Sequence, residues 1–291
     1  MSDPIVVGVD GSASALAAVR WAADEAARHR VPVRLVHAYQ LPTRGYPEIV
    51  LTGNEVRRAF EEAGRERLAE AERAVLDAAP EVEVTTSLVV DGPAPALIEE
   101  SRRARLVVLG SRGLGGFTGL VVGSVAVAVS AHGACPVVVV REQPPAEGPV
   151  VVGVDGSEVS EQAVAFAFEQ ASVRGAPLTA LLAWTDFLVD SAYGSRLTVD
   201  WSQVEDEQRR LLAERLAGWQ EKYPDVPVTR VVVRDRPVRA LLQAADGARL
   251  LVVGSHGLGG FTGMLLGSTS QALLHHAPCP LAVVRPGEGE R

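Results

Sequence analysis

Ile5-Val6-Val7-Gly8-Val9-Asp10-Gly11-Ser12 lies at the start of the chain, and the same pattern returns as Val150-Val151-Val152-Gly153-Val154-Asp155-Gly156-Ser157. Each stretch has the composition of a short β-branched strand followed by an Asp-Gly-Ser turn, with a serine placed to cap a helix. A second repeat, Gly-Leu-Gly-Gly-Phe-Thr-Gly, occurs unbroken at 113–119 and 257–263. The chain is therefore expected to contain two copies of one domain.

Within each copy, short β-branched runs alternate with longer segments of helical period. In the first copy this predicts strands near 5–9, 33–38, 82–90, 105–110 and 136–141. One helix is predicted to be capped by Ser12 or Ser14 and to run to about His29, and another covers about 54–78, with further helices starting at Pro93 and near Ser124. Such alternation favours a parallel sheet covered by helices. The predicted fold class is α/β, with two tandem five-stranded parallel-sheet domains, helices on both faces, and a Rossmann-like nucleotide-binding architecture.

The boundary between the two copies is marked by prolines and glycine. Pro144, Pro145, Gly148 and Pro149 fall within eight residues that separate the last strand of the first copy from the first strand of the second. Such a segment breaks regular structure and forms a short, stiff linker. The chain of 291 residues is therefore divided into a domain over 1–143 and a domain over 144–291.

Composition and charge exclude several classes of partner. The formal net charge is -8, which repels a phosphate backbone, so no nucleic acid partner is expected. No apolar run approaches the length of a bilayer-spanning helix, so no membrane partner is expected either. Cys135 and Cys279 have neither metal-site nor disulfide spacing, and the N-terminus lacks the pattern of an export signal. These features predict a soluble, cytoplasmic protein and no metal site.

Two glycine-rich loops carry the clearest chemical signal. The segments 111–123 and 255–267 each contain five glycines and no acidic residue. Such a loop can bring backbone N–H groups close to an anion, and the N-terminus of a following helix adds partial positive charge. Glycines that merely permit a tight connection between strand and helix are the alternative. Both copies, however, share the spacing Gly-x2-Gly-x9-Gly-Ser, at Gly110, Gly113, Gly123 and Ser124, and at Gly254, Gly257, Gly267 and Ser268.

Asp10 and Asp155 follow the first strand of each copy, at the edge where an open parallel sheet binds its ligand. A carboxylate there can accept hydrogen bonds from ribose hydroxyls, although aspartate also suits a turn before Gly-Ser. Arg112 can pair with phosphate, and its replacement by His256 makes the two predicted sites unequal. His37 is expected to be structural.

These motifs resemble the universal stress proteins in their tandem-domain form, over almost the whole chain. The resemblance implies ATP in a crevice of each domain, with Asp10 and Asp155 near the nucleoside and the glycine loops on the phosphates. It also implies that backbone near 36–38 and 182–184 contacts adenine. The candidate ATP-binding residues are Gly8, Val9, Asp10, Ala38, Gly110, Ser111, Arg112, Gly113, Gly123, Ser124, Val125, Gly153, Val154, Asp155, Ala183, Gly254, Ser255, His256, Gly257, Gly267, Ser268 and Thr269.

Several enzyme signatures are missing from the sequence. There is no P-loop, and the only lysine is Lys222 on a predicted surface helix. Neither loop carries paired carboxylates for Mg²⁺, so any hydrolysis of ATP is expected to be slow. No catalytic residue is predicted, and ADP or AMP remain alternatives to ATP as the ligand.

The preferred hypothesis is a regulatory ATP-binding module in the stress response. The rivals are a slow ATPase or nucleotide-transfer enzyme, and a structural partner with vestigial loops. A homodimer through the terminal strands 137–141 and 281–285 is expected, together with regulatory protein partners that the sequence does not identify.

Overall fold

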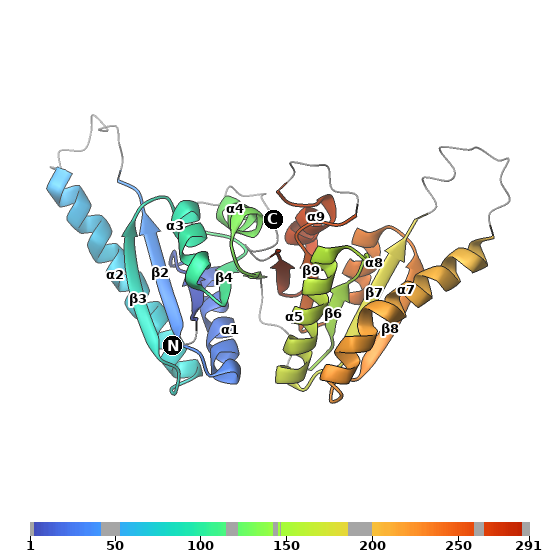
Figure 1. Ribbon diagram of the computed structural model, residues 1–291. Coiled ribbons are helices and arrows are strands. Elements are labelled where there is room, and N and C mark those ends of the chain that lie inside the picture. Colours follow the sequence, from blue (N-terminus) through green and yellow to red (C-terminus); the bar gives the residue numbers. More distant parts are fainter. Residues whose placement is uncertain are drawn as a thin grey trace. The chain divides into compact units, whose positions relative to one another are not determined.

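The chain divides into two compact units, Met1–Gln143 and Pro144–Arg291, in the computed structural model. The structure describes residues 3–41, 53–114, 122–141, 145, 147–185, 200–258 and 265–286. Each unit combines a parallel sheet with helices on both sides of it (Figure 1). The predicted α/β class with two tandem parallel-sheet units is confirmed. Three of the linker positions, 142–144, lie outside the described residues, as does position 146.

The first unit follows a regular alternation of strand and helix. Its elements are β1 (Ile5–Gly8), α1 (Ala13–His29), β2 (Val33–Tyr39), α2 (Gly53–Ala78), β3 (Val84–Val90), α3 (Pro93–Glu100), the 3-10 turn η1 (Ser101–Arg103), β4 (Leu106–Gly110), α4 (Ser124–His132) and β5 (Val137–Val140). The strand order is β3-β2-β1-β4-β5, and each neighbouring pair is parallel. The winding direction reverses between β1 and β4, which places a crevice at the carboxyl ends of these strands.

The second unit repeats this plan. Its elements are β6 (Val150–Gly153), α5 (Glu158–Arg174), β7 (Leu178–Trp184), α7 (Trp201–Lys222), β8 (Val228–Arg234), α8 (Pro237–Ala244), β9 (Leu250–Gly254), α9 (Ser268–His276) and β10 (Leu281–Val284). The strand order is β8-β7-β6-β9-β10, again with parallel pairs, and the reversal lies between β6 and β9.

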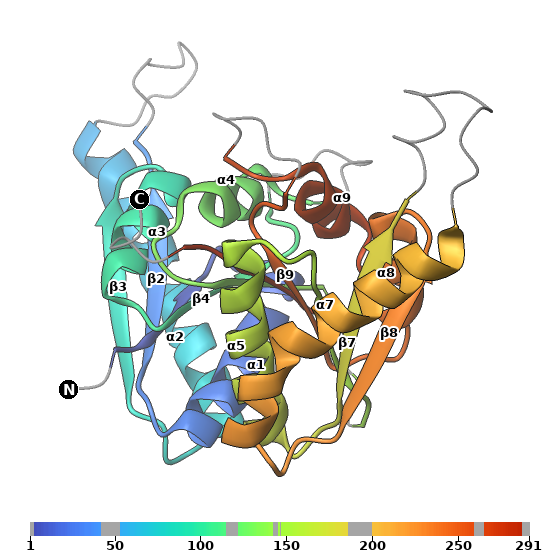
Figure 2. The same ribbon diagram turned by 45° about the vertical axis from the view of Figure 1, so that its right-hand side comes forward.

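Among the described residues, two helices cover each face of the sheet in each unit. In the first unit α1 and α2 pack together against β2 and β4, while α3 and α4 pack together on the other face. Right-handed crossovers require this division, because the chain first winds toward β3 and then back toward β5. Figure 2 shows the same layering in the second unit, where α5 and α7 lie together and α8 contacts α9.

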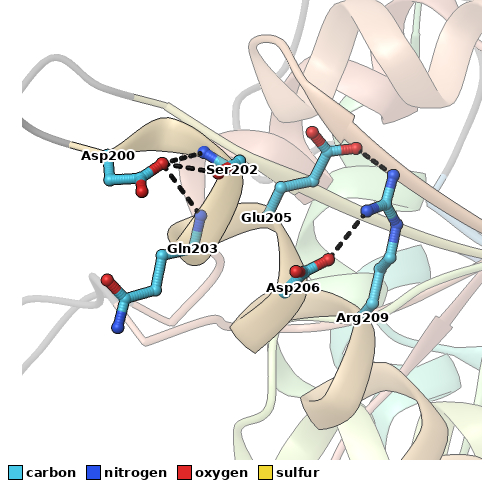
Figure 3. A network of polar contacts seen from close by, with 6 residues as sticks. All are labelled: Asp200, Ser202, Gln203, Glu205, Asp206 and Arg209. Carbon is cyan, nitrogen blue, oxygen red and sulfur yellow. Dashed lines mark hydrogen bonds and ion pairs between the residues drawn. The ribbon is translucent and has the colours of Figure 1, made fainter.

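The helix ends explain where each helix begins. Ser12 caps α1 by accepting the N–H of Ala15, and Ser157 caps α5 in the same way with Ser160. Proline occupies the first turn of α3, as predicted, and Pro237 occupies the same place in α8. Asp200 caps α7 by accepting the N–H groups of Ser202 and Gln203, and one turn further along Arg209 bridges Glu205 and Asp206 (Figure 3).

Most predicted element boundaries agree with the structure to within a few residues. The third strand starts at Val84 rather than 82, because Val82 instead donates its N–H to Ala79 in the turn that closes α2. Cys135 and Cys279 are buried free thiols just before β5 and β10, as expected. In the described part of the chain, no helix combines the length and apolar character that crossing a bilayer requires.

Candidate functional site

Asp10 links the end of β1 to the glycine-rich loop in the first unit. Its Oδ1 accepts the N–H of Ser12 at 2.9 Å, which holds the turn after β1. Its Oδ2 accepts the N–H of Leu114, also at 2.9 Å, across 104 residues of sequence. The carboxylate therefore stabilises both the turn after β1 and the first part of the loop that follows β4.

The glycines of this loop are required by close contacts. A Cβ atom at Gly113 would lie 2.5 Å from Asp10 Oδ2, and one at Gly110 would lie 2.6 Å from the backbone carbon of Ser14. Real Cβ atoms do not approach other atoms so closely, so any side chain here would displace the aspartate or the start of α1. Glycine is thus a packing requirement at Gly110 and Gly113, whereas a Cβ atom at Gly123 would lie 3.6 Å from its nearest neighbour, an ordinary contact.

Two serines at the start of α1 hold the same loop by its backbone. Ser12 Oγ donates to the carbonyl of Arg112 at 3.1 Å, and Ser14 Oγ donates to the same carbonyl oxygen. The carbonyl of Arg112 therefore points toward α1. This arrangement fixes the backbone from which the Arg112 side chain extends.

The loop ends at the N-terminus of α4. Gly123 donates its N–H to the carbonyl of Ser111 at 2.8 Å, so the two ends of the loop meet. Gly123 is the N-cap of α4, and no side chain caps the helix there. The first-turn amides of α4, beginning with Ser124, are therefore placed to bind an anion at this edge of the sheet.

The second unit reproduces this arrangement. Asp155 Oδ1 accepts the N–H of Ser157 at 3.0 Å, and Oδ2 accepts the N–H of Leu258 at 3.0 Å. A Cβ atom at Gly257 would lie even closer to Asp155 Oδ2 than in the first unit. Gly267 again donates to the carbonyl of Ser255, at 2.7 Å, and caps α9 without a side-chain bond.

A cavity of about 320 Å³ lies between these groups in the second unit. This volume is at the lower end of the range for small-molecule sites. Its lining residues are Gly153, Val154, Asp155, Ser160, Leu181, Ala183, Pro237, Leu241, Val253, Gly254, His256, Gly257, Leu258, Gly267, Ser268, Thr269 and Ser270. The cavity brings together the candidate residues of this unit, except Ser255. That side chain is fully buried beneath the loop, where its Oγ lies 2.9 Å from His256 Nδ1.

The candidate residues of the first unit lie at the matching positions. Gly8 ends β1, Val9 donates its N–H to the carbonyl of Val36 at 2.9 Å, and Ala38 lies in the last part of β2. Ser111 is buried and donates its N–H to the carbonyl of Val140, and Val125 lies in the first turn of α4.

His37 has a structural role, as the sequence suggested. The side chain is buried, with Nδ1 only 2.6 Å from the carbonyl oxygen of Val9, so Nδ1 carries the proton and donates it. The guanidinium of Arg67 lies 3.4 Å from Nε2 on the other side of the ring. Because a guanidinium can only donate, Nε2 is the acceptor in this contact. His37 thus ties β2 to the end of β1, directly beside Asp10.

The charges near the loops differ between the units. In the first unit Arg141 directly follows β5, next to the loop. Burial, and secondly the positive charge of Arg112, lower the pKa of Arg141. In the second unit the equivalent Arg285 donates to the carbonyl of Leu265 at 3.2 Å, and His256 stands in place of Arg112. Across the described residues, no group of three or more His, Cys, Asp or Glu side chains is arranged to hold a metal ion.

Sequence reasoning missed some of the residues at this site. Ser160 and Ser270 line the cavity of the second unit, and both are only 3% exposed. Pro237 and Leu241 form an apolar part of the wall, from α8. Proline in a first turn and an apolar residue one turn later are common in helices, so nothing in the sequence set this wall apart from ordinary packing.

Comparison with known proteins matches this arrangement to one family over nearly the full chain. The family model described as the universal stress protein family matches residues 1–141 and 148–285. Universal stress protein Rv2005c of Mycobacterium tuberculosis is 44% identical over 97% of this chain and 96% of its own. Universal stress protein Rv2623 of the same organism is 41% identical over 97% of this chain and 96% of its own.

A solved structure agrees on the fold. The crystal structure of a universal stress protein from Archaeoglobus fulgidus covers 99% of this chain and all of its own length, with a TM-score of 0.72. Its sequence identity of 18% supports the fold alone.

Proposed function

The chain belongs to the universal stress protein family, and from this premise we propose that each unit binds ATP and that nucleotide occupancy regulates what the protein contacts. The observation that carries the proposal is the cavity of the second unit. A carboxylate lies in its wall, and a glycine loop with the uncapped N-terminus of α9 forms another part. The first unit has the same aspartate, loop and helix start.

The chemistry of these groups matches the parts of a nucleotide. Backbone amides at a helix N-terminus bind phosphate, and the loops that precede α4 and α9 add no negative charge. The Asp155 carboxylate can accept hydrogen bonds from ribose hydroxyls. The wall formed by Leu181, Ala183, Pro237 and Leu241 suits the flat apolar face of a base.

The regulatory part of the proposal rests on the coupling between aspartate and loop. Because Asp10 and Asp155 each accept a loop N–H, a ligand that contacts the carboxylate also acts on the loop. A ligand changes a conformational equilibrium only through contacts that differ between the states. In this proposal that contact is the ligand's bond to the aspartate, whose carboxylate also holds the loop by a hydrogen bond. A loop held in one position by nucleotide would present a constant surface to a protein partner.

Release of bound nucleotide tests the proposal directly. Freshly purified protein is denatured, and the released small molecules are identified and counted by mass spectrometry. The expected result is adenine nucleotide in the wild-type protein, at up to two per chain, and its loss in an Asp10→Ala/Asp155→Ala variant. Asp24→Ala is the control, since this carboxylate lies on the surface of α1 in an ion pair with Arg28. A wild-type protein that carries no nucleotide and fails to bind added ATP would refute the proposal.

A further inference from the structure

The cavity of the second unit has an unusual charge for a site that receives a polyphosphate. Among its described lining residues, Asp155 is the one carboxylate, and there is no arginine or lysine. His256 is the other titratable residue of the wall. Since its Nδ1 lies 2.9 Å from Ser255 Oγ, one ring nitrogen is already used within the protein. A ligand with several negative charges would therefore meet one fixed negative charge and no fixed positive charge in this wall.

Hydroxyl groups supply the polarity of this wall instead. Ser160, Thr269 and Ser270 line the cavity. The oxygen of Ser160 accepts the N–H of Asp155 at 3.2 Å, which sets the hydroxyl beside the carboxylate. The Ser270 hydroxyl donates to the carbonyl of Gly254 at 2.6 Å, so Ser160 and Thr269 are the hydroxyls of this set that can donate to phosphate or sugar oxygens without adding charge.

The first unit carries apolar side chains at all three of these positions. The repeat aligns Ser160 with Ala15, Thr269 with Val125, and Ser270 with Ala126. The first unit keeps the hydroxyl of Ser124, which matches Ser268, but it lacks hydroxyls at the positions of Ser160 and Thr269. Recognition of phosphate there rests on the backbone amides, on Ser124 and on the arginines near the loop.

Two arginines are brought to the loop of the first unit. Ser111 donates its N–H to the carbonyl of Val140 at 2.9 Å, so Arg112 and Arg141 each follow a member of this hydrogen-bonded pair. Burial, and secondly the positive charge of Arg112, lower the pKa of Arg141, in keeping with the position of both residues beside this backbone hydrogen bond. Like charges held close together are stabilised by a ligand with more than one negative charge. In the second unit Arg285 remains, but the charge of Arg112 is replaced by His256.

We propose that both sites accept ATP but differ in their preference for phosphate number: the first unit favours a nucleoside di- or triphosphate over a monophosphate, and the second unit discriminates less against a nucleoside monophosphate. Arg112 is the positioning charge that selects for the longer phosphate chain, and the hydroxyl set headed by Ser160 replaces it in the second unit. This inference rests on the proposed nucleotide binding and adds the substrate class of each site.

The test uses full-length chains in which one site at a time is disabled. Gly257→Ala leaves the first site, and Gly113→Ala leaves the second. If either glycine variant loses helical circular dichroism signal, or still binds nucleotide at both sites, Asp155→Ala replaces Gly257→Ala and Asp10→Ala replaces Gly113→Ala. Each chain is titrated calorimetrically with ATP, ADP and AMP, and the readout is the ratio of ATP affinity to AMP affinity.

The ratio of ATP affinity to AMP affinity is expected to be at least about tenfold higher for the first site than for the second. A difference of this size corresponds to one hydrogen bond to a charged group. Arg112→His should lower this ratio in the chain that keeps the first site, and His256→Arg should raise it in the chain that keeps the second. Arg102→His is the matched control, because this arginine lies just before β4, at the end of the strand far from the loop.

The outcomes separate this inference from the function on which it rests. Equal ratios at the two sites, or a higher ratio at the second, would overturn the inference while leaving nucleotide binding in place. A shift caused equally by Arg102→His would attribute the effect to net charge and also overturn it. Binding of none of the three nucleotides by the wild-type chain would overturn the proposed function itself.

Discussion

Alanine at Gly113 provides the sharpest test of the site, because its effect follows from one contact. The added Cβ would lie 2.5 Å from Asp10 Oδ2, so the carboxylate must move. The oxygen that moves is the one that accepts the N–H of Leu114 at 2.9 Å. A hydrogen bond to a charged group contributes about 1.5–3 kcal/mol. If the binding conformation of the loop loses about 2 kcal/mol of stabilisation from this bond, the nucleotide affinity falls about thirtyfold.

The measurement is a calorimetric titration with ATP, in a chain whose second site is disabled by Asp155→Ala. The control is Gly218→Ala on α7, where a Cβ atom would meet nothing within 4 Å. Alanine favours a helix over glycine by about 1 kcal/mol, so this variant should be slightly more stable and bind ATP normally. Wild-type affinity in the Gly113→Ala chain would show that the contact between Asp10 and the loop has no part in binding, and the reasoning would fail.

Three further predictions concern stability. Burial raises the pKa of the Cys135 and Cys279 thiols to about 12, above the value of about 8.5 in an unfolded chain. The folded chain therefore holds these protons longer, and the free energy of unfolding should fall as pH rises from about 9 to about 12, less so in a double alanine variant. Phe168→Ala should cost about 3–5 kcal/mol in urea unfolding, since this ring is fully buried. Arg34→Ala should cost about 1 kcal/mol at low salt and less at high salt, because the ion pair with Glu100 is partly exposed.

The fold could be predicted closely from the sequence because the same domain pattern occurs twice in the chain. The turn at Gly8-Val9-Asp10 and its copy after β6 located the switch point of each sheet. Short β-branched runs located the strands. What the sequence could not convey is which polar groups face the cavity. Ser160 sits one turn into a helix that Ser157 already caps, so its sequence context describes an ordinary helix start.

Arg141 and Arg285 were missed for a related reason. An arginine after a run of valines usually marks the end of a strand and the return to solvent. Only the register of β4 against β5, and of β9 against β10, shows that these residues come next to the glycine loops. Register is a property of strand pairing, and it is set by contacts between distant parts of the chain.

The contact between Asp10 and Gly113 restricts the order in which mutations can accumulate. Alanine at Gly113 collides with the aspartate, whereas the same alanine beside a shortened side chain at position 10 would have room. The two positions are therefore coupled, because a shorter side chain at position 10 removes the contact that requires glycine at position 113. Arg112 and Ala15 of the first unit are replaced by His256 and Ser160 in the second, whereas the aspartate and its glycine are the same in both units.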